Sequence, residues 1–540
     1  MTAWPPPRLP PHTARNAIVG CFLLLLAMLA CGQCARAQVV HVANYSGSTF
    51  DGWKRCTVDV MPPHEAGQVA NGFSNKITHF VLGRRIGVDV RVIDLRVRLE
   101  PGEIRSIDLS AATPWGFTRG SLPLDPLAFF GQPSIAGVPL SVANVQPDGA
   151  GWLVHLRARV GPMLHTDLWT TWYPDQPGWC AGELAVTASN PAVPDVTATV
   201  PDGFLLRFGA ADVLIPGLQP EPTNPQGARA GGARLLPAGS VIGDGQARSW
   251  PIVLVWRQHL RTVDEWSSAG AAANLAICAN GIARLYPDGN PQLAAGTAPL
   301  AWTIANWAGA IERLHTWDAG PIGVTARSPS AGAVEDQVFV GAECAGTPGL
   351  GAETVRYLVA LGQSRRPCHH LEADGSLLDL ARHPQLRFWD ARPHWHTGVS
   401  PDQLGKSRGL TELETHGWWG PDVEHWLQNT VALAARLTGS PALQWQLAAQ
   451  ARVYLLQWTV APGLSTSQCY AARAVGWEAI NVVHLWRGLE NRVLAAMVRE
   501  RWLARLDAIL LPQLGAAALD IWDTRIDDAR LGTYSTRSGK

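Results

Sequence analysis

The chain has 540 residues, enough for roughly two to four domains with full hydrophobic cores, and its formal net charge at pH 7 is zero. Without an excess of positive charge the protein has no field that attracts polyphosphates, so the composition argues against a nucleic-acid partner. Its 24 tryptophans outnumber its 7 tyrosines and 11 phenylalanines, an order that suits the binding of flat, hydroxylated ligands such as sugars and that a GC-rich genome also produces.

The first 37 residues are typical of a secretory signal. Basic residues precede an apolar run from Ile18 to Ala30, and small residues end the segment at Ala37. A run of about 13 residues is short for a membrane span, which needs about 20. We therefore expect residues 1–37 to be cleaved and the mature protein to be exported to the periplasm or the extracellular space. A lipoprotein signal that ends at Cys31 is the less favoured alternative.

Cleavage near Ala37 would leave six widely spaced cysteines, namely Cys56, Cys180, Cys278, Cys344, Cys368 and Cys469. An even number allows three disulfides in an exported protein, and buried free thiols are the alternative. None of the six forms a close pair of the kind that binds a metal.

Residues 38 to about 257 predict a β-rich half, because short alternating or β-branched runs are separated by Gly, Pro, Asp and Asn. The 14 residues from Ile86 to Leu99 alternate throughout and predict a single strand, and Trp152–Val160 and Ile252–Trp256 predict two more. The half is longer than one ordinary sandwich. We therefore divide it into a small β module, residues 38–110, and a β-sandwich, residues 111–260, with a long loop at Pro216–Gly232.

After residue 260 the apolar residues follow a helical period. The predicted helices are Ile304–His315, Ala352–Gln363, Val423–Leu437, Ala442–Trp458, Ala472–Glu490 and Val493–Leu511. The last four form two αα hairpins, which turn at Thr438–Pro441 and near Asn491. The predicted fold class is therefore multidomain, β then α. The β-sandwich modules precede a toroid-like α/α-hairpin domain, residues 261–540, with fewer hairpins than a closed toroid needs.

Between residues 389 and 426 the chain holds five tryptophans and four histidines together with several carboxylates. Indole, imidazole and carboxylate groups need hydrogen-bond partners once they are buried, so the segment predicts a polar site with aromatic walls. We expect the following residues to bind substrate: Arg392, His394, Trp395, His396, Trp418, Trp419, Asp422, Glu424 and, further along, Trp477.

His394 and His396 would project to the same side of an extended segment, where Asp390 and His416 could complete a set of metal ligands. The spacing is weak evidence, so we predict no metal or other cofactor and keep a divalent metal as the alternative. Upstream of these histidines, Asp374-Gly375 predicts a simple turn.

Two helical stripes carry the other candidate groups. At about 100° per residue, Asp422, His425 and Asn429 share one helix face, while Arg473 and Trp477 share another. Glu478 points away from the second stripe, and Tyr470 precedes its helix. Each candidate also has a structural interpretation: a partner for the helix dipole at Asp422, a hydrogen-bonded histidine at position 425, a buried ion pair at Glu478 and a packing role for Tyr470.

The chain contains no Gly-rich phosphate loop, no Gly-x-Ser-x-Gly elbow and no HEXXH zinc helix. Nucleotide binding and serine-hydrolase chemistry are therefore not expected.

Residues 417–426, GWWGPDVEHW, lead into a helix that ends with Leu437-Thr438-Gly439 behind an exported β-rich half. This order resembles the toroid hairpins of YetA-like, exo-rhamnogalacturonan-lyase-like carbohydrate-active proteins. The resemblance covers the hairpin sequence and, elsewhere, only the order of the domains. It implies β-elimination of an acidic polysaccharide, but it transfers no catalytic residue.

Elimination beside a uronate carboxylate needs a group that neutralises this carboxylate, a base for the adjacent carbon-bound proton and an acid for the leaving oxygen. The candidates are Arg473 or Asn429 as neutraliser, His425 or His416 as base and Tyr470 as acid, with tryptophans 395, 418 and 419 stacking on sugar rings. The first alternative is glycoside hydrolysis by two carboxylates from Asp422, Glu424 and Glu478. The second is a secreted glycan-binding or surface structural protein. In each case the expected partner is a polysaccharide or an oligosaccharide.

Overall fold

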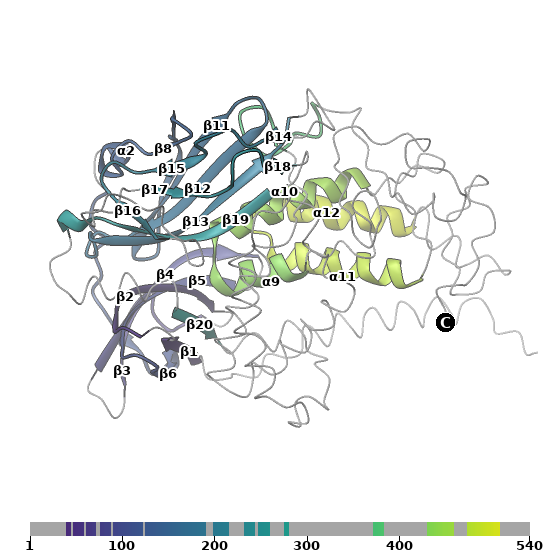
Figure 1. Ribbon diagram of the computed structural model, residues 1–540. Coiled ribbons are helices and arrows are strands. Elements are labelled where there is room, and N and C mark those ends of the chain that lie inside the picture. Colours follow the sequence, from purple (N-terminus) through teal and green to yellow (C-terminus); the bar gives the residue numbers. More distant parts are fainter. Residues whose placement is uncertain are drawn as a thin grey trace, which may run out of the picture.

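The computed structural model describes residues 39–44, 47–58, 61–71, 76–87, 90–122, 125–190, 198–214, 232–242, 247–259, 275–279, 371–382, 429–457 and 472–507 (Figure 1). Most of its strands come first and its long helices last, so the predicted order, β then α, is confirmed. The expected signal segment, most of the predicted Pro216–Gly232 loop and the predicted helices Ile304–His315 and Ala352–Gln363 lie outside these ranges. Among the helices within them, none is long and apolar enough to cross a membrane.

Two antiparallel sheets form the first β module. The first sheet has the order β2 (Phe50–Val58), β5 (Val90–Leu99), β4 (Lys76–Ile86), β3 (Ala66–Asn71), β7 (Thr113–Pro114). The second sheet has the order β20 (Leu275–Ala279), β1 (Val39–Asn44), β6 (Ile104–Asp108). A short 3-10 helix, η1 (Leu109–Ala111), follows β6. Apolar residues of both sheets, such as Val42, Phe50 and Leu95, share one buried core. β20 comes from far along the chain, and the sequence analysis does not anticipate it.

The strand predicted at Ile86–Leu99 is confirmed over Val90–Leu99 (β5), but it does not begin at Ile86, which is the last residue of β4 and forms a hairpin with β5. β4 ends at Ile86, Gly87 takes φ = +61°, and Ile86 pairs with Val90 at the start of β5. Both arms of a hairpin alternate with the same period, so the pattern by itself does not show a tight turn between them. Gly87 is the residue that permits the reversal, because a left-handed backbone costs glycine almost nothing.

A β-sandwich forms the second module, which agrees with the predicted sandwich. Its large sheet has the order β10 (Ser141–Asp148), β11 (Gly151–Val160), β12 (Leu164–Trp172), β13 (Trp179–Ala188), β19 (Ala247–Val255), β16 (Asp212–Leu214). The smaller sheet has the order β17 (Gly232–Arg234), β15 (Leu205–Arg207), β8 (Ser134–Ile135), β9 (Val138–Pro139), and β14 (Ala198–Thr199) pairs with β18 (Val241–Ile242). The short helices α2 (Pro126–Phe129) and η2 (Arg257–His259) complete the module. Phe204, Leu206 and Trp256 are buried in the core of the sandwich, and β11 and β19 confirm the two strands predicted there.

The later helices confirm the two predicted αα hairpins: α9 (Asn429–Thr438), α10 (Pro441–Gln457), α11 (Ala472–Gly488) and α12 (Arg492–Arg505). Pro441 is the first residue of α10, and the hydroxyl of Ser440 accepts a hydrogen bond from the amide of Leu443 as an N-cap. Asn491 caps α12 in the same way by accepting from Leu494. The four helices lie together beside the β modules (Figure 1).

Contacts between the hairpins give the direction of each helix. Near the start of α10, Gln444 donates to the carbonyl of Gly488 at the end of α11, whereas later in α10 Tyr454 accepts from Asn481, nearer the start of α11. α10 and α11 are therefore antiparallel. Because a two-residue turn makes α9 antiparallel to α10, α9 and α11 run in the same direction.

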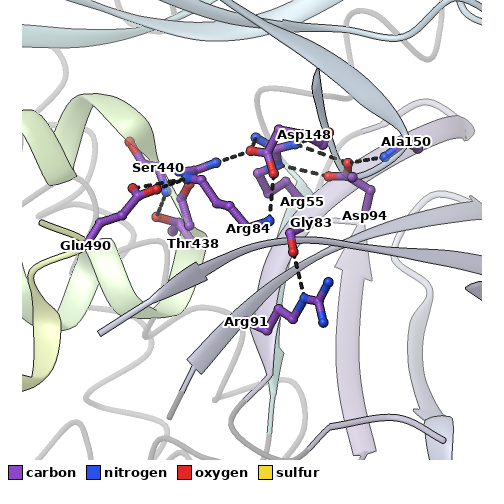
Figure 2. A network of polar contacts seen from close by, with 12 residues as sticks. Arg55, Gly83, Arg84, Arg91, Asp94, Asp148, Ala150, Thr438, Ser440 and Glu490 are labelled. Carbon is purple, nitrogen blue, oxygen red and sulfur yellow. Dashed lines mark hydrogen bonds and ion pairs between the residues drawn. The ribbon is translucent and has the colours of Figure 1, made fainter. Parts of the chain in front are cut away.

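Buried ion pairs join the first sheet, the sandwich and the helices at one point (Figure 2). Arg55 of β2 contacts Asp94 of β5 and Asp148 of β10, each at 2.9 Å, and both carboxylates are fully buried. Arg84 of β4 binds Asp148 as well as Glu490 and the carbonyl oxygen of Gly439 from the helix turns. One arginine thus connects a sheet, a sandwich hairpin and both αα hairpins.

Burial by itself would raise the pKa of Asp148, but the charges of Arg55 and Arg84 and the amide of Arg84 outweigh this effect and lower the pKa below its ordinary value. The stabilisation from Asp148 is therefore fully present above the pKa of an unfolded aspartate and is lost as the pH falls through the lower folded pKa.

We predict that Asp148→Asn destabilises the protein by roughly 3 kcal/mol or more, because it leaves two buried guanidinium groups without their shared carboxylate. Asp51→Asn is the matched control, since Asp51 pairs with Arg96 where both side chains are about a third exposed, and it should cost less than about 1 kcal/mol. Denaturant titration at neutral pH measures both values. Equal losses for the two variants would show that the buried junction is not important for stability.

We predict that Gly87→Ala is more destabilising than Gly102→Ala. Both glycines have positive φ, at +61° and +72°, so both substitutions carry the left-handed strain of roughly 1–2 kcal/mol. Only at Gly87 would the new Cβ overlap the carbonyl oxygen of Arg487 at the end of α11, whereas Gly102 faces open space. Thermal unfolding of the two variants tests the difference, and identical melting temperatures would contradict it.

Candidate functional site

The large sandwich sheet has one apolar face and one polar face. Leu156 of β11 and Leu168 of β12 point into the sandwich core. The residues on either side of each leucine along its strand point to the opposite face of the sheet. The opposite face carries His155, Arg157, His165, Asp167 and Trp169, with Glu183 on β13. Because this face is turned towards α10, its polar groups lie at an interface between modules.

Asp167 is the centre of this face. Its Oδ1 atom lies 2.7 Å from Nε2 of His155 and accepts a hydrogen bond of 2.7 Å from Nε of Arg157, and its side chain is fully buried. The strand register places Arg157 opposite Asp167 and His155 opposite Trp169. With Nε2 donating to the carboxylate, Nδ1 is the basic nitrogen of a neutral His155 ring.

Aromatic rings and α10 enclose His155. The imidazole stacks on the indole of Trp169, with centroids 4.6 Å apart and planes inclined by 14°, and Trp169 contacts Trp445 of α10 at 5.3 Å. α10 is held on this face by two hydrogen bonds, from Ser440 to Glu183 and from Gln446 to Ser249. The site is thus formed by the sandwich on one side and a helix on the other.

Several buried polar atoms on this face have no hydrogen-bond partner among the described residues, and three of them lie at neighbouring positions: Nδ1 of His165, Oδ2 of Asp167 and the hydroxyl of Thr187. His165 and Thr187 are directly opposite each other on β12 and β13, and Asp167 is the next residue on the same side of β12. Buried polar groups are nearly always satisfied, so a cluster of three indicates a place for water or for ligand hydroxyl groups.

A tight turn covers one end of the cluster and confirms the turn predicted at Asp374-Gly375. The amide of Gly375, at φ = +80°, donates to the carbonyl of Glu372 at 2.8 Å. A Cβ on Gly375 would lie 2.9 Å from Cδ of Arg157 and 3.1 Å from Nδ1 of His165, so only glycine fits here without movement. The hydroxyl of Ser189 anchors the turn at the amide and carbonyl of Leu371.

These groups are suited to proton transfer and to the binding of a carboxylate. A histidine oriented by a carboxylate is a common general base, and a guanidinium group binds carboxylates through paired N–H groups. Among the described residues, no three His, Cys, Asp or Glu side chains lie together as metal ligands.

Most of the residues predicted as the site lie outside the described ranges: Arg392, His394, Trp395, His396, His416, Trp418, Trp419, Asp422, Glu424, His425 and Tyr470, together with Asp390 of the alternative metal set. Asn429 is the first residue of α9, and Arg473, Trp477 and Glu478 lie in the first half of α11. For these four residues only the backbone is described.

The backbone separates the two candidate neutralisers. Ala432 of α9 lies beside Gly488 of α11, since a Cβ on Gly488 would be 3.3 Å from that of Ala432. Asn429 is one helical turn before Ala432, while Arg473 is about four turns before Gly488. At a rise of 1.5 Å per residue, the heights of Asn429 and Arg473 along the parallel helix axes differ by about 18 Å. Arg473 and Asn429 therefore belong to different parts of the helical layer.

Strand β11 was predicted from the sequence, but the site residues His155, Arg157 and Asp167 were not. The available signal was the pattern His-x-Arg on β11 followed by His-x-Asp on β12, which places four ionisable side chains on one face of a hairpin. This pattern normally indicates a solvent-facing surface, and only the position of α10 makes it an interface.

Cys56 and Cys180 are free and buried, which excludes both from the three possible disulfides and agrees with the alternative of buried free thiols at these two positions. Burial raises the pKa of each thiol, so both are unreactive as nucleophiles. The side chains of the other four cysteines lie outside the described part of the structure.

Comparison of the chain with protein-family models, with curated proteins and with solved structures finds no match. The functional inference therefore depends on the geometry of the site and on the sequence.

We predict that His165 makes the protein less stable in mild acid. Burial lowers the pKa of His165, although the Ser189 carbonyl and Asp167 oppose this effect. The folded protein thus binds fewer protons here than the unfolded chain, whose histidine has a pKa near 6.5. The stabilisation is complete above that pH and is lost as the pH falls below it.

His165→Gln keeps an N–H donor for Ser189 and removes the titration. Between pH 7 and pH 5 its free energy of unfolding should decline less steeply than that of the parent, by up to about 1.4 kcal/mol per pH unit. Denaturant titrations of both proteins at several pH values in this range measure the two slopes. If parent and His165→Gln have the same slope in denaturant titrations, His165 does not cause the acid sensitivity.

Proposed function

We propose that the protein is exported and cleaves an acidic, uronate-containing polysaccharide by β-elimination. The observation that carries the proposal is the buried polar face of the sandwich, where His155, Arg157 and Asp167 lie beside an aromatic pair under α10. Ligand sites occur preferentially at interfaces between modules, and the unsatisfied atoms of His165, Asp167 and Thr187 can be satisfied by the hydroxyl groups of a sugar.

In this proposal His155 is the base that removes the carbon-bound proton. Asp167 orients the imidazole through Nε2 and stabilises the imidazolium that forms, which leaves Nδ1 to accept the proton. Arg157 uses Nε for Asp167 and makes a long contact of 3.5 Å from Nη1 to the carbonyl of Asp374, and its charge can neutralise the uronate carboxylate. The indoles of Trp169 and Trp445 line the site for stacking on a sugar ring.

The helical domain would supply the remaining groups. Two stacked hairpins with parallel α9 and α11 support a toroid-like α/α domain. Tyr470, just before α11, is the proposed acid for the leaving oxygen, and His416 or His425 is the alternative base. The resemblance to exo-rhamnogalacturonan-lyase-like proteins implies the same reaction class.

Glycoside hydrolysis is the second candidate function, because Asp167 and Glu183 lie on the same sheet face in diagonal positions of neighbouring strands. Two carboxyl groups that flank a glycosidic bond are the usual machinery of hydrolases. The products distinguish the two reactions, since only elimination leaves a double bond in the new non-reducing sugar.

We predict that digestion of a panel of acidic polysaccharides releases unsaturated uronate products, measured as a rise in ultraviolet absorbance. His155→Gln and Asp167→Asn should each lower kcat by roughly 100-fold or more, since a positioned base contributes at least that factor. His64→Gln is the matched control and should keep full activity. His425→Ala should also retain activity if His155 is the base.

Other outcomes would change the assignment. New reducing ends without the absorbance change would establish hydrolysis. Binding of the polysaccharides without either product would contradict both enzyme proposals and leave a glycan-binding protein. Full activity of a folded His155→Gln variant together with loss of activity in His425→Ala would place the base at the helical hairpin.

A further inference from the structure

An extended segment at the seam between the two β modules carries two aromatic rings. It follows β7, has no regular secondary structure, and alternates the half-buried rings of Trp115 and Phe117 with the exposed residues Gly116 and Thr118. Both rings pack on Trp53 of β2, with centroid distances of 6.5 Å and 6.3 Å. The two partly exposed rings of the segment are therefore supported from below by the buried ring of Trp53.

The same segment approaches a third ring, Trp152, at the start of β11. The indole N–H of Trp152 donates to the carbonyl of Gly120 at 2.9 Å, which ties this ring to the end of the segment. The indole N–H of Trp53 donates to the carboxylate of Asp175 at 2.9 Å, which fixes the orientation of the Trp53 ring. Fixed rings lose little conformational entropy when a ligand binds.

Arg119 adds a positive charge between these rings. Its guanidinium group donates to the carbonyl of Gly149 and lies 6.0 Å from the centre of the Trp152 ring. A carbonyl does not neutralise a cation, and Arg119 forms no ion pair with any other described residue. The charge is therefore available to a negatively charged group that lies along the rings.

We call the rings of Trp115, Phe117 and Trp152, together with Arg119, the aromatic row. The aromatic row is separate from the His155 site. Trp152 and His155 are three residues apart on β11, and alternation turns their side chains to opposite faces of the sheet. Trp152 packs against the sandwich core side, whereas His155 faces α10.

We propose that the aromatic row binds a strand of acidic polysaccharide across the seam between the β modules. Sugar rings would stack on Trp115, Phe117 and Trp152, and Arg119 would pair with a uronate carboxylate. The proposal takes its ligand class from the proposed function, but it concerns binding and requires no cleavage. The exposed Gly116 and Thr118 and the charge of Arg119 interrupt the apolar surface of the rings, which suits a hydroxylated, charged chain better than the continuous apolar surface of a protein partner.

The experiment is affinity electrophoresis of the full chain in gels that contain polygalacturonate, alginate or hyaluronate, or neutral galactan as a reference. Trp115→Leu and Phe117→Leu keep apolar packing on Trp53 but remove the flat ring. Each should raise the dissociation constant for the acidic polymer that retains the parent by roughly two- to tenfold. Thr118→Ala, at the exposed position directly after Phe117, is the matched control and should bind like the parent.

Arg119→Gln tests the charge. It should weaken retention by the acidic polymer and leave retention by the neutral galactan unchanged. Circular dichroism and thermal melting confirm that each variant is folded. Cleavage of a short uronate oligosaccharide, measured in parallel, should be unaffected in all four variants, which separates the row from the His155 site.

Parental retention of both leucine variants, or no retention of the parent by any acidic polymer, would overturn the proposal. A parent that migrates as a dimer in size-exclusion chromatography and dissociates in Phe117→Leu would assign the row to self-association instead. Absence of cleavage with retention intact would contradict only the proposed function, because retention is measured without turnover.

Discussion

Two buried carboxylates, Asp94 and Asp148, are the constraint on which the rest of the structure depends. Charges without solvent are tolerated only with opposite charges and complete hydrogen bonding, so Arg55 and Arg84 must be at this point. Arg84 also binds the turns of both αα hairpins. The relative position of the three modules is therefore restricted by electrostatic pairing, while their individual cores are formed by apolar packing.

The ion-pair network around Asp148 determines which element covers the polar face of the large sandwich sheet. With the helix turns held by Arg84, α10 extends over β12 and β13, and its Ser440 and Gln446 bind polar side chains of that sheet. An uncovered face with histidines, arginines and carboxylates would be an ordinary solvated surface. Under α10 and the turn at Gly375 the same residues are desolvated, so burial lowers the pKa of His165, and Asp167 is fully buried. The chemical character of the candidate site thus depends on an ion-pair network in another part of the molecule.

Local patterns predicted much of the secondary structure and little of the site. The turns predicted at Thr438–Pro441 and near Asn491 were correct, because the residues that end one helix and start the next lie within a few positions. The strand predicted from Ile86 to Leu99 was right over Val90–Leu99 and wrong at its start, because the turn at Gly87 leaves the alternation unchanged. Of the predicted catalytic residues only Asn429, Arg473 and Glu478 lie in described helices, and the parallel packing of α9 and α11 places the first two far apart along their axes.

The sequence by itself determined the order of strands and helices, the caps and the alternation of polar and apolar residues along each strand. These properties depend on backbone geometry and on neighbours close in the chain. Only the tertiary structure decided that the polar face of β11 and β12 is buried and that Trp169, on which His155 stacks, meets Trp445 of the distant helix α10. Burial and charge pairing between distant segments are not encoded in any local period, because they arise only when the modules pack together.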